Sequence, residues 1–326
     1  MTRSLRVVVS RRIFPALVDE LRGEFDVFAN QDDVAWSATE LAAALRDADG
    51  ALITAGDRID EALLAQCPRL KIVANIAVGY NNIDLTACSR HRVLATNTPE
   101  VLNDATADHA WALLLAAARR VGESERWLRA GKWKRWTFEM FTGAEVSGST
   151  LGILGMGRIG RAIARRAGGF SMPVIYHNRA RLPADQEAGA RHVGFEMLLR
   201  EADHLVLVVP YSEAVHHIIG AEQLALMKPG AVLVNIARGG VVDDAALVIA
   251  LREGRIAAAG LDVYENEPAL NPGLLELENV VLTPHIASST RKTRTAMAAL
   301  AIANVRAALA GARPPSLLNP EVLQDR

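Results

Sequence analysis

The segment at residues 151–160, LGILGMGRIG, constrains the fold of this chain more strongly than any other. Its first four residues form a short apolar run, which is typical of a strand buried on both faces. Gly155, Gly157 and Gly160 follow with G-x-G-x-x-G spacing, and residues 158–168 have the spacing of a helix. Such glycines allow a tight turn, a close approach of backbone to a pyrophosphate, and close packing of helix on strand. The segment therefore predicts a dinucleotide-binding turn.

Apolar runs alternate with helical segments after this turn. The runs lie at residues 173–178, 204–210, 231–237, 257–264 and 280–286. Together with the strand before the turn, they predict six strands in a doubly wound parallel sheet. Ligands bind at the carboxyl edge of such sheets, so we expect the chemistry where these strands end.

The first hundred residues repeat the alternation without a glycine fingerprint, which predicts a smaller, flavodoxin-like α/β domain. Its four expected strands lie at residues 6–10, 50–55, 71–80 and 93–99.

Two helical segments connect these domains. We interpret residues 101–133 as one long helical segment that leads into the cofactor domain, and residues 293–311 as an apolar helix that returns to the first domain. We therefore expect two Rossmann-like domains. An NAD(P)-binding domain at residues 101–287 is inserted into a substrate domain that is formed by residues 1–100 and 288–326.

Composition excludes several kinds of partner. Half of the residues are apolar and the formal net charge is −1. The chain has no long basic run and no apolar span of about twenty residues, so we expect neither a nucleic acid nor a membrane as partner. The N-terminal sequence MTRSLRVVVS lacks the apolar core of a signal peptide. Cys67 and Cys88 lack metal-ligand spacing, so we predict buried thiols, no metal site and a cytoplasmic location.

Charged side chains stand at the ends of three of the predicted strands. Arg238 comes directly after the fourth, the fifth finishes in GLDVYENEP with Asp262, Glu265 and Glu267, and the sixth finishes in LTPHIASS with His285. An arginine can hold a carboxylate through two parallel hydrogen bonds, and a histidine held by a carboxylate can donate a proton to a carbonyl that is being reduced. Each residue alone is compatible with a structural role, but together they indicate hydride transfer to a 2-oxo acid. Glu265 competes with Glu267 as the partner of the histidine.

Five motifs extend this pattern over nearly the whole chain: VGYNNID, LGILGMGRIGRAIARR, MKPGAVLVNIARGGVVDDAAL, AAGLDVYENEP and LTPHIASST. In this order they resemble the D-isomer-specific 2-hydroxyacid dehydrogenase family. Within it they resemble the glyoxylate/hydroxypyruvate reductases, including the 2-ketogluconate reductase branch. The resemblance implies an oxidoreductase that uses a nicotinamide cofactor to reduce small 2-oxo acids to D-2-hydroxy acids, with glyoxylate, hydroxypyruvate and 2-ketogluconate as candidate substrates.

The resemblance also implies roles for individual residues. Arg238 binds and orients the substrate, and Glu267 pairs with His285, the general acid/base. The implied substrate-binding residues are Val78, Gly79, Arg238, Met140 and Phe141. The implied cofactor-binding residues are Thr106, Gly155, Met156, Gly157, Arg158, Ile159, Gly160, Asn178, Arg179, Arg181, Val209, Pro210, Ile236, Ala237, Arg238, Asp262, His285, Ala287 and Ser288.

Two positions distinguish this chain within the family. Ala287 stands where the family often has glycine, which adds one methyl group near the nicotinamide pocket. The second strand of the cofactor domain ends in YHNRAR, where an NAD-selective enzyme presents Asp or Glu to the ribose. Asn178 occupies that position, and Arg179 and Arg181 can bind an adenosine 2′-phosphate. We therefore predict that NADPH is preferred to NADH.

The segment at residues 131–143, GKWKRWTFEMFTG, concentrates aromatic residues in a chain where they are scarce. Trp, Phe and Met are enriched in interfaces, so we expect a homodimer formed through an arm at residues 101–145. The resemblance implies that Met140 or Phe141 reaches the neighbouring active site. Two alternatives remain: an NAD-linked D-lactate- or 3-phosphoglycerate-type dehydrogenase, and a non-enzymatic NAD(P)-sensing scaffold on the same fold.

Overall fold

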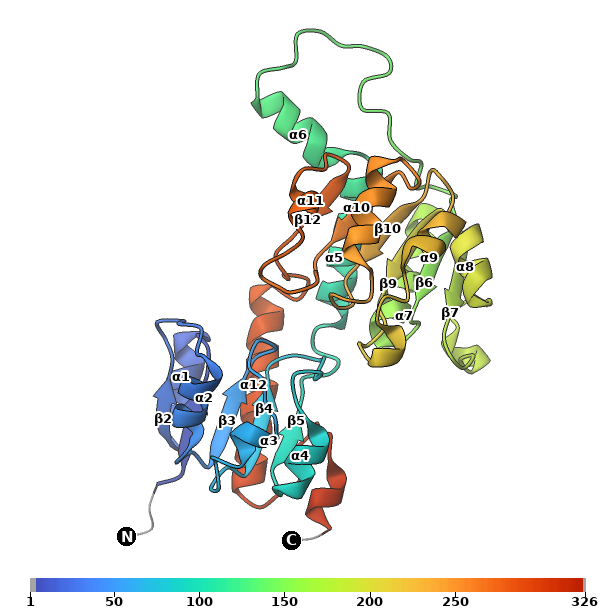
Figure 1. Cartoon of the computed structure of the whole chain (residues 1–326). Helices are drawn as coiled ribbons and strands as arrows, with labels where there is room; N and C mark the ends of the chain where they lie inside the picture. Colours follow the sequence, from blue (N-terminus) through green and yellow to red (C-terminus); the bar gives the residue numbers. More distant parts are fainter. Residues whose placement is uncertain (1–3, 325–326) are drawn as a thin grey trace. The chain divides into compact units, whose positions relative to one another are not determined.

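Two compact units, each built on its own parallel β-sheet, make up the computed structural model, which describes residues 4–324 (Figure 1). The first unit is the described part of Met1–Leu102 and Thr290–Arg326, and the second is Asn103–Ser289. Both sheets are sandwiched between helices, which confirms the predicted α/β class. Among the described helices, none combines the length and the apolar character needed to cross a bilayer.

The first sheet has five parallel strands in the order β2-β1-β3-β4-β5, which is the flavodoxin-like order. The strands are β1 Arg6–Val9, β2 Asp26–Ala29, β3 Gly50–Ile53, β4 Ile72–Asn75 and β5 Leu94–Thr96. The sequence predicted only four of them. It missed β2 because an edge strand of four residues, half of them exposed, shows no apolar run.

Helices cover both faces of the first sheet. They are α1 Pro15–Arg22, α2 Ala38–Leu45, α3 Glu61–Leu64, α4 Leu85–Arg90 and α12 Arg291–Leu309, followed by the 3-10 turn η4 Pro320–Leu323. Helix α12 packs on β3, β4 and β5 and also contacts α1. The chain therefore returns to the first unit through α12. The apolar side chains of α2, α3 and α4 form one core with alternate residues of the strands, including Val8, Ile53 and Val73.

The second sheet has seven parallel strands in the order β12-β11-β10-β9-β6-β7-β8, a doubly wound arrangement. The strands are β6 Leu151–Leu154, β7 Val174–His177, β8 Arg191–His192, β9 His204–Leu207, β10 Val232–Asn235, β11 Ala258–Leu261 and β12 Val280–Leu282. Six of them lie within the predicted runs. The seventh, β8, is a two-residue edge strand that is too short to give a sequence signal.

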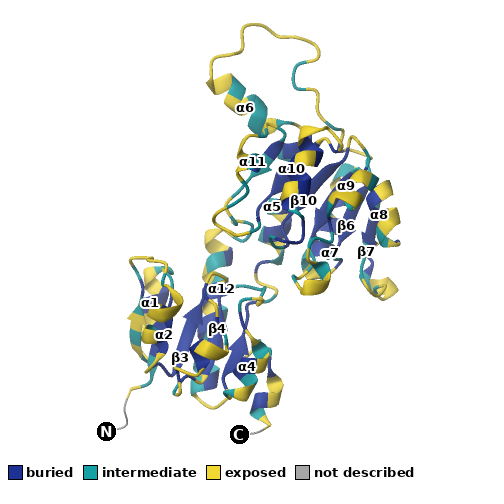
Figure 2. Cartoon of the chain, viewed as in Figure 1, coloured by how far each residue is buried: buried dark blue, intermediate teal, exposed yellow. Residues whose placement is uncertain are grey.

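Two cores lie on the two faces of this sheet, and the strands between them are almost wholly buried (Figure 2). The helices are α5 Asn103–Ala118, α6 Val121–Arg129, α7 Arg158–Ala167, α8 Phe195–Glu201, α9 Ala221–Leu226, α10 Asp244–Arg252 and α11 Pro272–Leu275. The 3-10 turns are η1 Gly168–Phe170, η2 Ala184–Gln186 and η3 Glu213–Val215. Helices α5 and α7 pack on one face, where Trp111 stacks on Phe170, while α8, α9 and α10 pack on the other.

The helical segment expected at residues 101–133 is divided, because the chain forms two helices there, α5 and α6. Helix α5 ends at Ala118, and Arg120 has a φ of +53°, which no right-handed helix can contain. Beyond α6 the chain returns, and the Ala144 N–H donates to the Ala118 carbonyl at 2.8 Å. A side chain at Gly143 would overlap that same carbonyl oxygen. The returning segment therefore occupies the space that a longer α5 would need.

Prediction for the thiols. Cys67 and Cys88 are 2% and 0% exposed in the core of the first unit. Burial raises the pKa of the Cys67 thiol to about 11 and that of the Cys88 thiol to about 12. Because only an accessible thiolate reacts readily, we expect the native protein to leave both thiols unmodified by iodoacetamide at neutral pH. The protein unfolded in guanidinium is the control and should show two reactive thiols. Rapid labelling of the native chain would contradict the described core.

Candidate active site

The candidate site lies at the carboxyl edge of the second sheet. All seven strands run parallel, so the loops that follow β6, β7, β9, β10, β11 and β12 leave the sheet at the same edge. These loops carry most of the residues that the sequence singled out. Each loop is held in place by contacts that the sequence does not reveal.

The glycine turn after β6 forms an open backbone cradle. Gly155 has a φ of +102°, and a Cβ there would lie 2.9 Å from the Val208 backbone. A Cβ at Gly160 would overlap the Gly155 carbonyl oxygen. At Gly157, in contrast, a Cβ would meet no atom within 4 Å, and no side chain caps the N-terminus of α7. The turn therefore leaves room for a ligand group where helical N–H groups and the helix dipole favour an anion, as a dinucleotide pyrophosphate requires.

The turn after β7 carries the residues that were expected to select the cofactor. Asn178 does not point freely into this turn, because its Oδ1 accepts a hydrogen bond from the Met156 N–H at 2.7 Å. This bond ties the turn to the glycine cradle. Arg179 is exposed, and within the described part of the chain it makes no ion pair or hydrogen bond.

Arg181 is hydrogen-bonded to the carboxylate of Glu187, a residue that the sequence analysis did not identify. Its Nε and Nη2 atoms donate to the two oxygens of Glu187 at 2.8 and 3.0 Å. The buried Tyr176 hydroxyl donates to the same carboxylate at 2.7 Å. These bonds, that of Arg181 first, lower the pKa of Glu187 to about 2. The YHNRAR turn itself contains no acid, but a carboxylate eleven residues beyond Tyr176 lies against it.

The loop after β10 presents Arg238. The buried Asn235 side chain shapes this loop, since its Oδ1 accepts from the Ala237 N–H at 3.0 Å and its Nδ2 donates to the Arg238 carbonyl at 3.3 Å. A side chain at Gly239 would overlap the Tyr264 carbonyl, so the loops after β10 and β11 lie in direct backbone contact. Burial lowers the pKa of the half-buried Arg238 guanidinium, and the nearby carboxylate of Glu267 opposes that shift.

His285 and Glu267 form a close pair across two loops. The Nδ1 atom of His285 lies 2.8 Å from Oε2 of Glu267, and Oε1 of Glu267 accepts from the Tyr264 N–H at 2.9 Å. Burial raises the pKa of Glu267, but its bonds to His285 and the backbone and the charge of Arg238 bring the net pKa below the ordinary value. The competing acid, Glu265, instead contacts His217.

A buried carboxylate, Asp262, positions the loop that carries His285. Its Oδ1 and Oδ2 accept from the N–H groups of Ile286 and Ala287, each at 2.8 Å. The Thr283 hydroxyl donates to Oδ1 at 2.7 Å. Burial raises the pKa of Asp262, but these bonds and one from a histidine of α5, His109, hold it below the ordinary value. His109 lies three residues after Thr106 in α5, and the sequence analysis did not identify it.

His285 itself has a φ of +53°, in the left-handed region. This conformation costs a non-glycine residue roughly 1–3 kcal/mol. The His285 N–H donates to the Asp262 carbonyl at 2.9 Å, so backbone as well as side-chain bonds maintain the turn. Strain of this kind is common where a side chain must be held in one direction.

The remaining predicted residues are distributed over both units. Thr106 is buried in α5, and Val209, Pro210, Ile236, Ala287 and Ser288 lie in the loops at the carboxyl edge. Met140 and Phe141 lie in the segment after α6. The Phe141 ring contacts the Trp127 ring edge-on there, with 5.3 Å between the ring centroids. Val78 and Gly79 belong to the first unit, in the loop after β4. Their carbonyls accept from Asn97 and Asn75, respectively, at 2.8 and 2.9 Å.

Comparison with known proteins places this site in context. The family described as "D-isomer specific 2-hydroxyacid dehydrogenase, NAD binding domain" matches residues 111–287. A glyoxylate reductase of Thermococcus onnurineus is 48% identical, over 98% of this chain and 98% of its own. A glyoxylate reductase of Pyrococcus furiosus is 46% identical, over 98% of this chain and 97% of its own.

Solved structures agree with these relatives. The NADPH-dependent glyoxylate/hydroxypyruvate reductase of Sinorhizobium meliloti, in complex with NADP and malonate, has a TM-score of 0.87 and 34% identity, and the match covers 97% of each chain. A glyoxylate reductase from Paecilomyes thermophila has a TM-score of 0.88 and 34% identity, and the match covers 98% of this chain and 100% of that one. The similarity extends over both units.

Prediction for the glycine cradle. A methyl group at Gly157 meets open space, whereas one at Gly160 meets backbone. We expect Gly157→Ala to unfold at nearly the parent temperature but to bind the dinucleotide more weakly, because the methyl group fills the position of the pyrophosphate. Gly160→Ala should lower the unfolding temperature, since overpacking costs about 1–3 kcal/mol. Thermal unfolding and cofactor fluorescence titration measure the two effects. Parent-like cofactor affinity in Gly157→Ala would show that the cradle is not the binding surface.

Proposed function

This chain belongs to the D-isomer-specific 2-hydroxyacid dehydrogenase family of oxidoreductases, and on that premise we propose that it reduces glyoxylate to the corresponding 2-hydroxy acid with NADPH. The observation that carries the proposal is the pair of His285 and Glu267, 2.8 Å apart at the sheet edge that also bears the open glycine turn. The names of the relatives support glyoxylate as substrate.

The chemistry follows from what each side chain can do. A bound nicotinamide supplies the hydride. Arg238 binds the substrate carboxylate and polarises the carbonyl, because a guanidinium forms two parallel bonds to a carboxylate. His285 donates a proton through Nε2 to the developing alkoxide, while its Nδ1 stays bonded to Glu267. Glu267 fixes the orientation of the imidazole through that bond, so that Nε2 is the nitrogen left to face the substrate.

The first unit contributes backbone groups to this proposal. We assign Val78 and Gly79 to the substrate carboxylate, which their N–H groups can bind. The carbonyls of both residues are already engaged by the amide side chains of Asn97 and Asn75. These two bonds hold the peptide groups of the loop in one orientation, which a fixed carboxylate site requires.

The choice of NADPH rests on Arg179. Asn178 replaces the acid that would bind the ribose hydroxyls of NADH, and Arg179 is an exposed cation with no partner among the described residues. Arg181 is less suited to the 2′-phosphate, because Glu187 already holds it through two bonds. The Sinorhizobium meliloti structure, which contains NADP, supports the same choice.

One experiment can rank the candidate substrates and test the alternative activities. Hydroxypyruvate and 2-ketogluconate remain candidate substrates, and an NAD-linked D-lactate- or 3-phosphoglycerate-type activity is the second candidate. A panel of these 2-oxo acids with NADPH and NADH ranks them by kcat/KM. The non-enzymatic scaffold is set aside, because the chain is an enzyme by family and retains the arginine, carboxylate and histidine at the strand ends.

A homodimer formed through the arm is part of the proposal. Within the arm, Trp136 and Phe138 are 69% and 88% exposed, and much of the segment is exposed (Figure 2). Apolar side chains of this size are enriched where protein surfaces meet. A second copy that covers them could place Met140 or Phe141 near its own active site.

Sedimentation velocity should therefore report a dimer, and Trp136→Ser together with Phe138→Ser should favour the monomer.

Prediction for the proton donor. His285→Ala should lower kcat for glyoxylate by roughly 10²- to 10⁴-fold, the loss typical of a general acid, with NADPH affinity little changed. Glu267→Gln should lower kcat as well, because the neutral amide cannot make the charge-assisted bond that holds the imidazole in place. Glu265→Gln is the matched control on the same loop, and it should retain most of the parent turnover. If His285→Ala turns over at the parent rate, the proton comes from another group.

Prediction for the cofactor. A hydrogen bond to a charged group contributes about 1.5–3 kcal/mol. Arg179→Ala should therefore lower the preference for NADPH over NADH by roughly ten- to a hundred-fold in the ratio of kcat/KM values. Arg181→Ala, the matched control, should change that ratio less, since Glu187 holds its guanidinium. A parent that prefers NADH, or an unchanged ratio in Arg179→Ala, would refute the role of the YHNRAR turn.

A further inference from the structure

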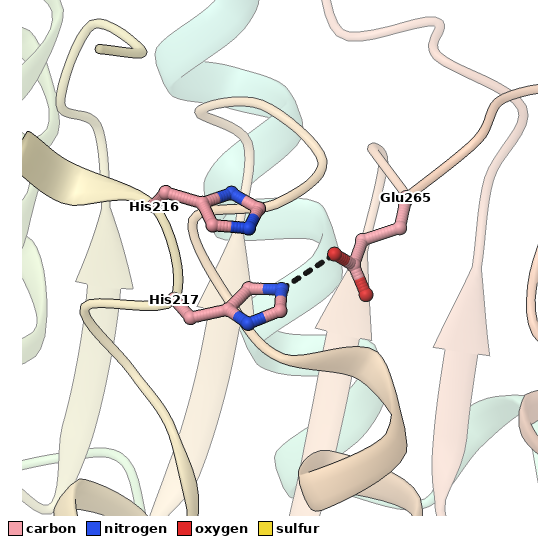
Figure 3. A group of neighbouring side chains, drawn as sticks. All are labelled: His216, His217 and Glu265. Carbon is pink, nitrogen blue, oxygen red and sulfur yellow. Dashed lines mark hydrogen bonds and ion pairs between the residues drawn. The ribbon is translucent and has the colours of Figure 1, made fainter. Parts of the chain in front are cut away.

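Three side chains that the proposed reaction does not use converge beside the loops of the active site. They are His216, His217 and Glu265, and Figure 3 shows both imidazoles on one side of the carboxylate. Each residue offers one ligand atom, and these atoms lie within 4.8 Å of one another. Among residues 4–324, this is the group of histidine, cysteine and acidic side chains whose geometry could hold a metal ion.

The cluster is already closely packed. His217 Nε2 lies 2.6 Å from Glu265 Oε1, as the dashed line in Figure 3 marks. The rings of His216 and His217 are stacked, with centroids 4.0 Å apart and an angle of 20° between their planes. His216 is exposed and the other two residues are partly buried, so an ion could enter from solvent.

Neighbouring groups orient the donor atoms. His216 Nδ1 lies 3.1 Å from the Tyr211 hydroxyl, so a proton on Nδ1 that is donated to Tyr211 leaves Nε2 with its lone pair. The backbone N–H of His217 donates to the Gly240 carbonyl at 2.7 Å. Oε2 of Glu265 accepts from the backbone N–H of Asp244 at 3.4 Å. Outer contacts of this kind orient ligands in metal sites.

We propose that His216, His217 and Glu265 bind a divalent first-row transition ion, with Zn²⁺ as the ion that best fits two imidazoles and one carboxylate. In a tetrahedral site with bonds of about 2.0–2.1 Å, ligand atoms lie roughly 3.3 Å apart. A separation of 4.8 Å would have to shorten by about 1.5 Å, which rotation of the exposed His216 side chain can supply. The 2.6 Å between His217 and Glu265 would have to lengthen by about 0.7 Å, as the ion takes the place of their direct bond. Water completes the coordination.

The third donor distinguishes this cluster from an ordinary hydrogen-bonded pair. His91 and Glu61 are equally close, with Nε2 and Oε1 2.7 Å apart, but their third neighbour is the guanidinium of Arg90. An arginine has no lone pair to offer and repels a cation. The His91 pair therefore serves as a matched control, since it has the same chemistry without the third ligand.

The position of the cluster gives the ion two loops to join. His216 and His217 follow β9 and η3, whereas Glu265 follows β11 and precedes Glu267 by two residues. Gly240, whose carbonyl holds His217, follows Arg238 by two residues. A bound ion would replace the bond between His217 and Glu265 and connect these loops directly.

The test is direct titration of the chelator-treated full-length protein with ZnCl₂ in a calorimeter, with equilibrium dialysis and metal analysis to count bound zinc. We expect one Zn²⁺ per chain at this cluster. His216→Gln and Glu265→Gln should each weaken its binding by at least about ten-fold, and Tyr211→Phe should weaken it by a smaller factor. His91→Gln should bind as the parent does, and circular dichroism verifies that each variant is folded.

Several results would overturn the site. Absence of binding at millimolar zinc would do so, and so would unchanged affinity in His216→Gln and Glu265→Gln. His285→Gln addresses a further possibility, since the active-site pair could also attract zinc. If that variant alone loses the ion and His216→Gln retains it, the zinc binds at the active site and the proposal fails.

Discussion

The parallel direction of the strands in the second sheet underlies everything that the site contains. Parallel strands send all their carboxyl ends to one edge, so the glycine turn, Arg238, Glu267 and His285 emerge there although 130 residues separate the first from the last. The strands themselves are short and mostly buried, and none of the residues proposed for the reaction lies within them. Their role is to fix the starting points of the loops, because a packed sheet moves little when the loops change.

Backbone contacts between the loops then fix the positions of the loops relative to one another, which the sheet alone cannot do. Gly239 lies against the Tyr264 backbone so closely that no side chain fits, and Asp262 binds the two N–H groups that follow His285. The Tyr264 N–H binds Glu267 in turn. The loops after β10, β11 and β12 are thereby joined to one another. This joining can offset the strain of the left-handed conformation at His285.

The two arginines of the turn after β7 differ in whether a carboxylate of the chain already binds them. Arg181 is held by Glu187, whose pKa is depressed by that bond and by the bond from Tyr176. Arg179, two residues away, is exposed. Two arginines that look equivalent in the sequence therefore differ in what they can bind, since Glu187 already takes two of the five N–H donors of Arg181 and neutralises its charge.

The fold class could be predicted from the sequence, because periodic apolar runs and the glycine spacing are local signals. Six of the seven strands of the second sheet were predicted from their apolar runs. Arg238, Glu267 and His285 were predicted to lie at the carboxyl ends of three of them. The short edge strands β2 and β8 were not predicted, because they show no apolar run. The break after α5 was not predicted either, because it lies where Ala144, 26 residues farther along the chain, bonds to Ala118.

Which side chains contact one another depends on how the loops pack in three dimensions. Glu265 and Glu267 are two residues apart and chemically alike, yet one contacts His217 and the other contacts His285. The partners of Arg181 and Asp262 likewise come from other parts of the chain. Local patterns report the period at which side chains are buried. They do not report distances between loops, which depend on how the whole sheet and its helices pack.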